Sequence, residues 1–310
     1  MNSGKKINRL LKIILPIAAV ILGIYGIGVW QTRQLNTALE FPPAASDTLA
    51  RFKLASDCTF KSITGSKVYF DMGSRHSFIQ QKVLDKLRSI NYPMEETGVF
   101  ICTVDNNGHR KLFTKKVRLD IHFPNPAMPD SIYILKNVDL LVSDDIYGNL
   151  IGMDILRHMV LEHINDANEI RLYLSVPSGY AEVCDINMNN SIWSGMCSTN
   201  RRASIDLVVN DEAPTKYYFD TGGDMRRFDL VQPLSMLPGA TSAVCVDPVT
   251  GLMVQEHCRV SFGNRLKYSS VVYADSLHTD KYSVNPLKLF DQDIVIDFPG
   301  EKLYTGNTRQ

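Results

Sequence analysis

The chain has 310 residues, of which 45% are apolar, and its 33 basic side chains balance 33 acidic ones. A chain of this length can bury a sizeable core in one or two domains. Because no net charge remains and no run of Lys or Arg occurs after the first twelve residues, the composition argues against a nucleic-acid partner.

The first thirty residues predict a membrane anchor. Residues 1–12, MNSGKKINRLLK, form a basic tail, and residues 13–30, IILPIAAVILGIYGIGVW, are apolar over 18 residues, about the length that a bilayer core requires. A cleaved signal peptide is the alternative, but its apolar region is usually shorter, and no small-x-small cleavage site precedes Gln31. The excess of positive charge before the apolar segment predicts a cytoplasmic N-terminus and an extracytoplasmic ectodomain, either periplasmic or extracellular.

The six cysteines all follow the apolar segment, and their even number suits an oxidising compartment. No pair has the CxxC spacing of a zinc or redox site. Disulfides are therefore expected, although six cysteines permit fifteen pairings. Short loops favour the pairs Cys184–Cys197 and Cys245–Cys258, and the remaining candidates are Cys58 and Cys102.

Residues 31–50 contain small, polar and proline residues without periodicity and are expected to form a tether. Beyond them the sequence is rich in alternating or β-branched segments, which include KVYFD, VRLDIHF, SIYIL, IRLYL, ASIDLVV, RVSF and SSVVYA. Helical patterns are short and occur at residues 78–90 and 155–160. The sequence therefore predicts a mostly-β ectodomain.

Two parts of the ectodomain resemble each other. The segment VYFDMGS at residues 68–74 returns as YYFDTGG at residues 217–223, and CTVDNNG returns as CVDPVTG with Gly again six residues after Cys. VRLDI then matches RVSF, and IRLYL matches EKLYT, in the same order along the chain. The repetition predicts two lobes of one topology, at residues 51–175 and 203–310, joined by a connector at residues 176–202.

These segments also resemble a known family. YFDMGSRHSFI, which begins at Tyr69, is similar to the Asp-Thr/Ser-Gly loop of aspartic peptidases. The segment NLIGMDILRHMVLEHINDANEIRLYL resembles the last third of a retropepsin-like lobe, and VNPLKLFDQDIVIDFPGEKLYTG repeats it with Asn285 where the family has glycine. The resemblance implies a bilobal aspartic-protease-like fold of two related β-barrel lobes with short helices.

The chemistry of peptide hydrolysis explains why an aspartate occurs twice. One carboxylate takes a proton from water while a second, protonated carboxyl donates a hydrogen bond to the amide carbonyl. Two carboxyls about 3 Å apart share a single proton, so one residue type supplies both acid and base. We therefore predict a catalytic dyad of Asp71 and Asp220, although either aspartate alone also fits a turn after a strand. The predicted supporting residues are Met72, Gly73, Ser74, Thr221, Gly222 and Gly223.

The residue after each aspartate distinguishes the two loops. In the family, a Thr hydroxyl at this position bonds to the backbone of the opposite loop, and Thr221 can form that bond. Met72 has no hydroxyl. This departure, together with Asn285, supports the alternative function, a catalytically inactive module of the cell envelope that binds a peptide or protein. An envelope scaffold is a third possibility, but it leaves the two Asp-x-Gly loops unexplained.

The turn at Asp105, Asn106, Asn107 and Gly108 lies between apolar segments, and the resemblance implies that it is a flap over bound peptide. The expected protein is thus a membrane-anchored aspartic endopeptidase that acts on a peptide or protein and needs no cofactor. The histidines and glutamate of HMVLEH have the wrong spacing for a metal site. The sequence does not predict an oligomeric state.

Overall fold

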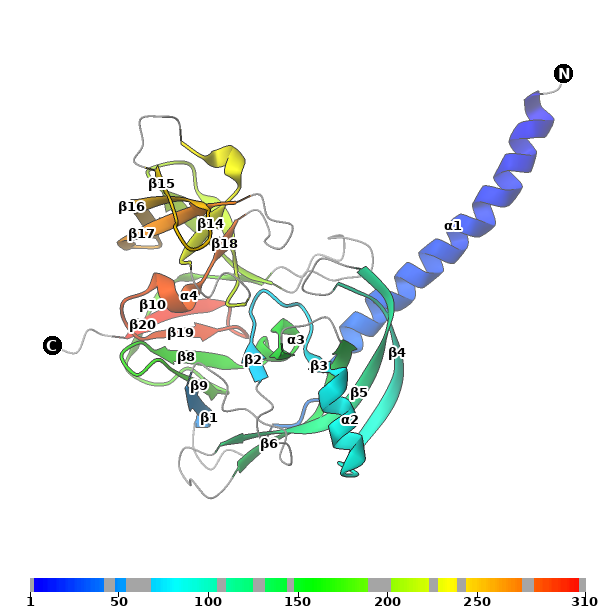
Figure 1. Ribbon diagram of the computed structural model, residues 1–310, viewed down its shortest axis with the longest axis horizontal. Coiled ribbons are helices and arrows are strands. Elements are labelled where there is room, and N and C mark those ends of the chain that lie inside the picture. Colours follow the sequence, from blue (N-terminus) through cyan, green and yellow to red (C-terminus); the bar gives the residue numbers. More distant parts are fainter. Residues whose placement is uncertain are drawn as a thin grey trace.

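The computed structural model describes residues 3–41, 48–53, 68–104, 110–124, 132–143, 148–188, 202–222, 228–238, 244–274 and 282–306. Its β-rich part contains three sheets, and one long helix, α1 (Ser3–Gln34), projects from it (Figure 1). Residues Lys12–Gln34 of α1 are long and apolar enough to cross a membrane, and only 6% of their most apolar window is buried. The predicted apolar segment 13–30 thus lies inside one continuous helix.

The first lobe is a six-stranded sheet in the order β2-β7-β3-β6-β5-β4. Its β-branched and aromatic segments alternate between a buried and an exposed face, as in β5, where Val117 and Leu119 are buried. The strands are β2 (Val68–Phe70), β3 (Phe78–Gln80), β4 (Met94–Val104), β5 (Arg110–Pro124), β6 (Ile132–Ser143) and β7 (Asn149–Ile151).

Two short helices accompany this sheet, α2 (Gln81–Ser89) and α3 (Met153–Leu156). The helix predicted at residues 78–90 is thus shorter than expected, because Phe78–Gln80 joins the sheet as β3 and pairs with β6. The helix predicted at residues 155–160 ends at Leu156, and Val160 begins a strand. In both cases strand pairing prevails over a local helical pattern.

The second lobe is an eight-stranded sheet in the order β11-β12-β13-β18-β14-β17-β16-β15. β12 pairs with both β13 and β16, and this second pairing closes the sheet into a barrel. The 3₁₀ helix η2 (Leu234–Met236) and helix α4 (Pro286–Leu289) accompany it. The strands are β11 (Asn187–Met188), β12 (Ala203–Val209), β13 (Thr215–Phe219), β14 (Leu230–Gln232), β15 (Val244–Val246), β16 (Met253–Phe262), β17 (Arg265–Tyr273) and β18 (Ser283–Val284).

The third sheet is shared by both halves of the chain and lies below the second lobe and to the left of the first lobe in Figure 1. Its order is β1-β9-β8-β19-β20-β10, with the antiparallel pair β8 and β19 at its centre. The hairpin of β8 and β9 is flanked by the edge strand β1, and the hairpin of β19 and β20 is flanked by the edge strand β10, so the order is symmetric. The strands are β1 (Thr48–Lys53), β8 (Val160–Ile164), β9 (Glu169–Tyr173), β10 (Tyr180–Asp185), β19 (Ile294–Asp297) and β20 (Lys302–Gly306).

The order of strands repeats between the halves. β2 pairs in parallel with β7, and β13 pairs in parallel with β18, while β3 and β14 occupy equivalent places next to β6 and β17. The segments IRLYL and EKLYT, which match in sequence, largely form β9 and β20, the outer strands of the two central hairpins. The two-fold repetition in the sequence thus corresponds to a two-fold repetition of topology.

The predicted disulfide between Cys245 and Cys258 is wrong. Cys245 lies opposite Val254 in the β15–β16 pair, whereas Cys258 lies further along β16, beyond a bulge that begins at Gln255. Cys245 is exposed and Cys258 is buried, and both are free thiols. Cys184 is likewise a free thiol. Cys58 and Cys197 lie outside the described residues, as does the side chain of Cys102.

Candidate active site

Two equivalent strand ends position the predicted dyad. Asp71 follows β2, and its backbone N–H donates to the carbonyl of Ile151 at 3.0 Å. Asp220 follows β13, and its N–H donates to the carbonyl of Val284 at 2.9 Å. Because Ile151 ends β7 and Val284 ends β18, the same parallel pairing holds both loops, and the two aspartates occupy equivalent places in the two lobes.

Each aspartate carboxyl lies against the glycine of the opposite loop. A Cβ atom built on Gly73 would lie 2.5 Å from Cγ of Asp220, and one built on Gly222 would overlap the carboxyl group of Asp71. No side chain fits at either glycine without displacing a carboxyl group. The structure therefore brings Asp71 and Asp220 together at the junction of the lobes.

Backbone amides orient both carboxyls. Oδ1 of Asp71 accepts from the N–H groups of Gly73 at 2.9 Å and Ser74 at 3.1 Å, and Oδ1 of Asp220 accepts from the N–H of Gly222 at 2.9 Å. The Asp71 side chain is 6% exposed. The carboxyls are thus held by rigid backbone rather than by mobile side chains, as preorganised catalytic groups require.

Thr221 links the two loops directly. Its Oγ1 accepts from the N–H of Met72 at 3.1 Å and donates to the carbonyl of Phe70 at 3.0 Å. Both partners lie in the other lobe, and Thr221 is only 8% exposed. A buried hydroxyl that serves as donor and acceptor at once fixes the relative position of the loops.

Met72 occupies the position equivalent to Thr221 but has a different role. Its side chain is 0% exposed and belongs to the apolar core. Packing of the Met72 side chain in the apolar core therefore holds the first loop, whereas the Thr221 hydroxyl bonds the second loop to the first.

The buried position of Met72 determines the expected effect of Met72→Thr. The substitution loses about 1.5–3 kcal/mol of apolar burial, and a new cross-lobe hydrogen bond returns about 1 kcal/mol. We expect the free energy of unfolding to fall by about 0.5–2 kcal/mol, measured by thermal unfolding of the full chain in detergent. Met72→Leu, which preserves the volume, is the control and should cost less. If Met72→Thr instead unfolds at a higher temperature than the native chain, the new cross-lobe hydrogen bond outweighs the lost apolar burial, which would contradict this prediction.

The position after β7 and β18 also differs between the lobes. A Cβ on Gly152 would lie 2.5 Å from the carbonyl oxygen of His76, so the first lobe requires glycine there. Asn285 takes this place in the second lobe, where its Oδ1 accepts from the N–H of Leu287 at 3.1 Å and caps α4. The departure from the family pattern at Asn285 is thus explained by helix capping.

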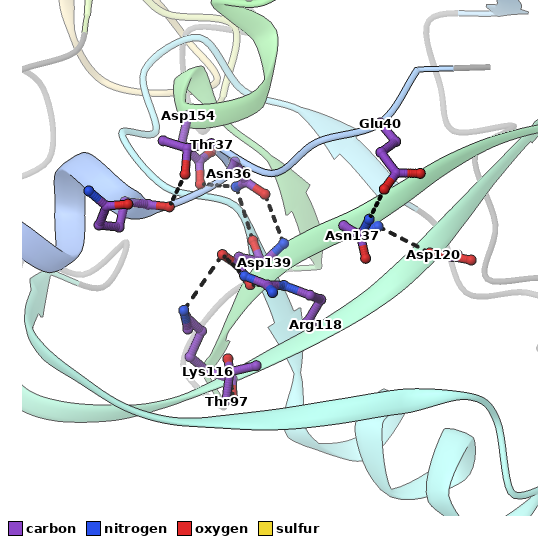
Figure 2. A network of polar contacts seen from close by, with 11 residues as sticks. Asn36, Thr37, Glu40, Thr97, Lys116, Arg118, Asp120, Asn137, Asp139 and Asp154 are labelled. Atoms are coloured by element: carbon purple, nitrogen blue, oxygen red, sulfur yellow. Dashed lines mark hydrogen bonds and ion pairs between the residues drawn. The ribbon is translucent and has the colours of Figure 1, made fainter. Parts of the chain in front are cut away.

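A buried polar network beside the first loop was not predicted (Figure 2). Ser77 Oγ accepts from the N–H of Gly152 at 2.9 Å and donates to Asp154 Oδ1 at 2.6 Å. Asn36 Nδ2 donates to the other oxygen of Asp154 at 2.8 Å. The network therefore extends from the turn after α1 to the backbone beside the dyad loop. Asp154 belongs to the Ile-Gly-Met-Asp segment that resembles the pattern of aspartic peptidases, but Asn36 carries no sequence signal.

One positive charge lies on the dyad loop itself. Burial, followed by the positive charge of Arg202, lowers the pKa of Arg75 to about 10. This pKa remains above neutrality, so Arg75 is cationic at physiological pH. The flap candidates Asp105, Asn106, Asn107 and Gly108, and the supporting residue Gly223, lie outside the described residues.

No protein-family model and no curated protein sequence matches the chain. Among solved structures, it is similar to conglutin gamma, a basic 7S globulin from lupine seeds, with a TM-score of 0.50 and 7% identity over 87% of this chain and 94% of that one. Basic 7S globulin from soybean has a TM-score of 0.47 and 7% identity, covering 86% of this chain and 93% of its own. A third structure, edgp, has a TM-score of 0.49 and 8% identity, covering 87% and 94%.

At such low identity the likeness to conglutin gamma concerns the fold alone. Together with the symmetric order of strands, it supports an aspartic-protease-like fold for the β-rich part of the chain. Function has to be argued from the site.

Proposed function

We propose that the chain is a membrane-anchored aspartic endopeptidase whose ectodomain lies outside the cytoplasm. The reciprocal contact of each aspartate with the opposite glycine is the observation that carries this proposal. A turn or capping role for Asp71 or Asp220 would not require the two side chains to meet across the lobes.

In the proposed reaction, one carboxylate of the dyad removes a proton from water as the water oxygen attacks the carbonyl carbon of a peptide bond. The other carboxyl, protonated, donates a hydrogen bond to the carbonyl oxygen. The C–N bond of the tetrahedral intermediate then breaks, and the leaving amine receives a proton from the dyad. Both carboxyls thereby return to their starting state, and no cofactor takes part.

The proposed localisation rests on α1. Its apolar length fits a bilayer, and the basic residues before it favour a cytoplasmic N-terminus. A signal sequence would share the apolar length. The end of α1 packs on the first lobe, where Gln31 bonds to Val99 and Leu35 is buried. This packing favours an uncleaved anchor, because cleavage near Gln31 would separate α1 from the lobe.

An inactive peptide- or protein-binding module is the second candidate. The chain shares its fold with conglutin gamma, which is named as a basic 7S globulin of seeds and not as a peptidase. The buried Met72 also shows that one of the two loops is packed without the threonine that active family members carry. These observations favour a module that uses the same two lobes to bind a segment of polypeptide without hydrolysing it.

A cleavage assay with the full chain in detergent separates the candidates. A mixture of unstructured peptides is incubated in ¹⁸O-labelled water, and the products are analysed by mass spectrometry. Direct attack by water predicts one ¹⁸O atom in each new carboxyl terminus after a single turnover, with no covalent adduct on the chain. Peptide binding without cleavage would contradict the peptidase and support the module, whereas a covalent adduct would contradict the dyad mechanism.

A further inference from the structure

Beyond the buried residues Val117 and Leu119, the same side of the β4–β5 hairpin carries exposed apolar and cationic side chains. Val99 lies directly opposite Lys115, and Phe113 precedes Lys115 by two residues, so all three point to the same side. Val99 is 53% exposed, Phe113 is 61% exposed, and Lys115 is exposed as well. We call these three residues the hairpin face. Large exposed apolar groups gathered beside a cation are typical of an interaction surface.

The helix α1 lies directly beside this hairpin. Gln31 Nε2 donates to the carbonyl of Val99 at 2.8 Å. Gly28 and Thr32, one helical turn apart, are buried on α1, and Figure 1 shows β4 passing beside this end of the helix. Trp30, in contrast, remains 62% exposed. The last turns of α1 therefore pack on the lobe along one side only.

The last turns of α1 also lie at the expected surface of the bilayer. Trp30 ends the apolar segment, and Arg33 follows as an exposed cation. Trp is enriched at the level of lipid headgroups, and Arg side chains near a helix end reach toward that level. Because Val99 is bonded to Gln31, between these two residues, the hairpin face lies at the same level.

The polar network shown in Figure 2 holds the lobe in this position. Asn36 Nδ2 donates to the carbonyl of Asp139 at 3.1 Å, and Asn36 Oδ1 accepts from the N–H of Asp139 at 2.8 Å. Glu40 and Lys136 then exchange two backbone hydrogen bonds at 3.3 and 3.1 Å. Leu35, between α1 and this network, is completely buried. The first lobe is thus fastened to the helix at several points rather than hung from a flexible linker.

We propose that the hairpin face binds the surface of the bilayer that α1 spans. Val99 and Phe113 enter the headgroup layer, and Lys115 contacts lipid phosphates, to which its charge is complementary. This inference rests on the proposed membrane anchor. It also specifies the substrates of the proposed peptidase. Because the predicted flap joins β4 to β5, binding of the hairpin face to the bilayer would favour peptide segments that lie next to the membrane.

The test uses the full chain in liposomes of phosphatidylcholine and phosphatidylglycerol. An environment-sensitive fluorescent amino acid replaces Phe113 in one variant and Tyr268 in a matched control, since Tyr268 is 62% exposed but lies in the second lobe. We expect blue-shifted emission at position 113, with several-fold stronger quenching by lipids spin-labelled at the headgroup than at position 268. Water-like emission and equal quenching at both positions would overturn the proposal.

A third labelled position separates failure of the anchor from failure of the docking. The same fluorescent amino acid replaces Ile21 in α1, where lipids spin-labelled deep in the acyl chains should quench it strongly. Quenching at position 21 without quenching at position 113 would overturn the docking alone. Absence of quenching at position 21 would overturn both the anchor and the docking, while the cleavage assay in detergent would still test the peptidase separately.

Discussion

Asp71→Asn and Asp220→Asn should each lower the rate of peptide cleavage by roughly 10³-fold or more, because an amide cannot take up or release the proton that the dyad shares. Asparagine keeps the shape of aspartate, and its Oδ1 can still accept from the N–H of Gly73 or Gly222. The loss is therefore expected in the catalytic rate, with little change in thermal stability. Initial rates on one cleaved peptide give the measurement.

The double variant provides a sharper test of the shared proton. Residues that act as one unit are strongly non-additive, so the double substitution should be little worse than either single one. Asp85→Asn is a matched control that should keep full activity, since Asp85 is exposed and interacts with Gln81 and Arg88 of the same helix, α2. Substantial cleavage by either single dyad variant would contradict the mechanism. Equal peptide binding by all variants, with no cleavage by the native chain, would instead support the binding module.

Asn36→Gly should lower the free energy of unfolding by about 2–4 kcal/mol, because it removes three buried hydrogen bonds. One of the three is donated to the Asp154 carboxyl, which is buried and would lose this donor. Asn36 has a φ of 57°, in the left-handed region, where glycine is readily accommodated. The substitution therefore isolates the side chain from the backbone conformation. A fall of about 5–10 °C in the midpoint of thermal unfolding in detergent is expected.

Asn91→Gly is the matched control for this prediction. Asn91 also has a left-handed φ, of 52°, but its side chain is exposed at the end of α2. Its replacement should change the free energy of unfolding by less than about 0.5 kcal/mol. If both variants unfold at the same temperature, the network of Asn36 does not hold the helix to the lobe, and the rigid placement of the hairpin face loses its support.

Much of the architecture could be predicted from local patterns. The apolar run at residues 13–30 fixes a long helix by its composition, and alternation of apolar residues marks most of the strands. The repeated Asp-x-Gly loops indicate two related halves, because equivalent turns after equivalent strands need the same residue types. These features depend on neighbours in the chain, which a sequence displays directly.

Contacts between distant segments could be decided only by the tertiary structure. The register of β15 and β16 separates Cys245 from Cys258, although a short loop in the sequence suggested a bond. Nothing adjacent to Asn36 indicates that it reaches Asp154, 118 positions away. The sequence by itself thus determined the two aspartates, the apolar helix and the repeated topology. Which groups meet across the lobes depends on packing and strand register, since many arrangements of the same local elements are compatible with one sequence pattern until the core is assembled.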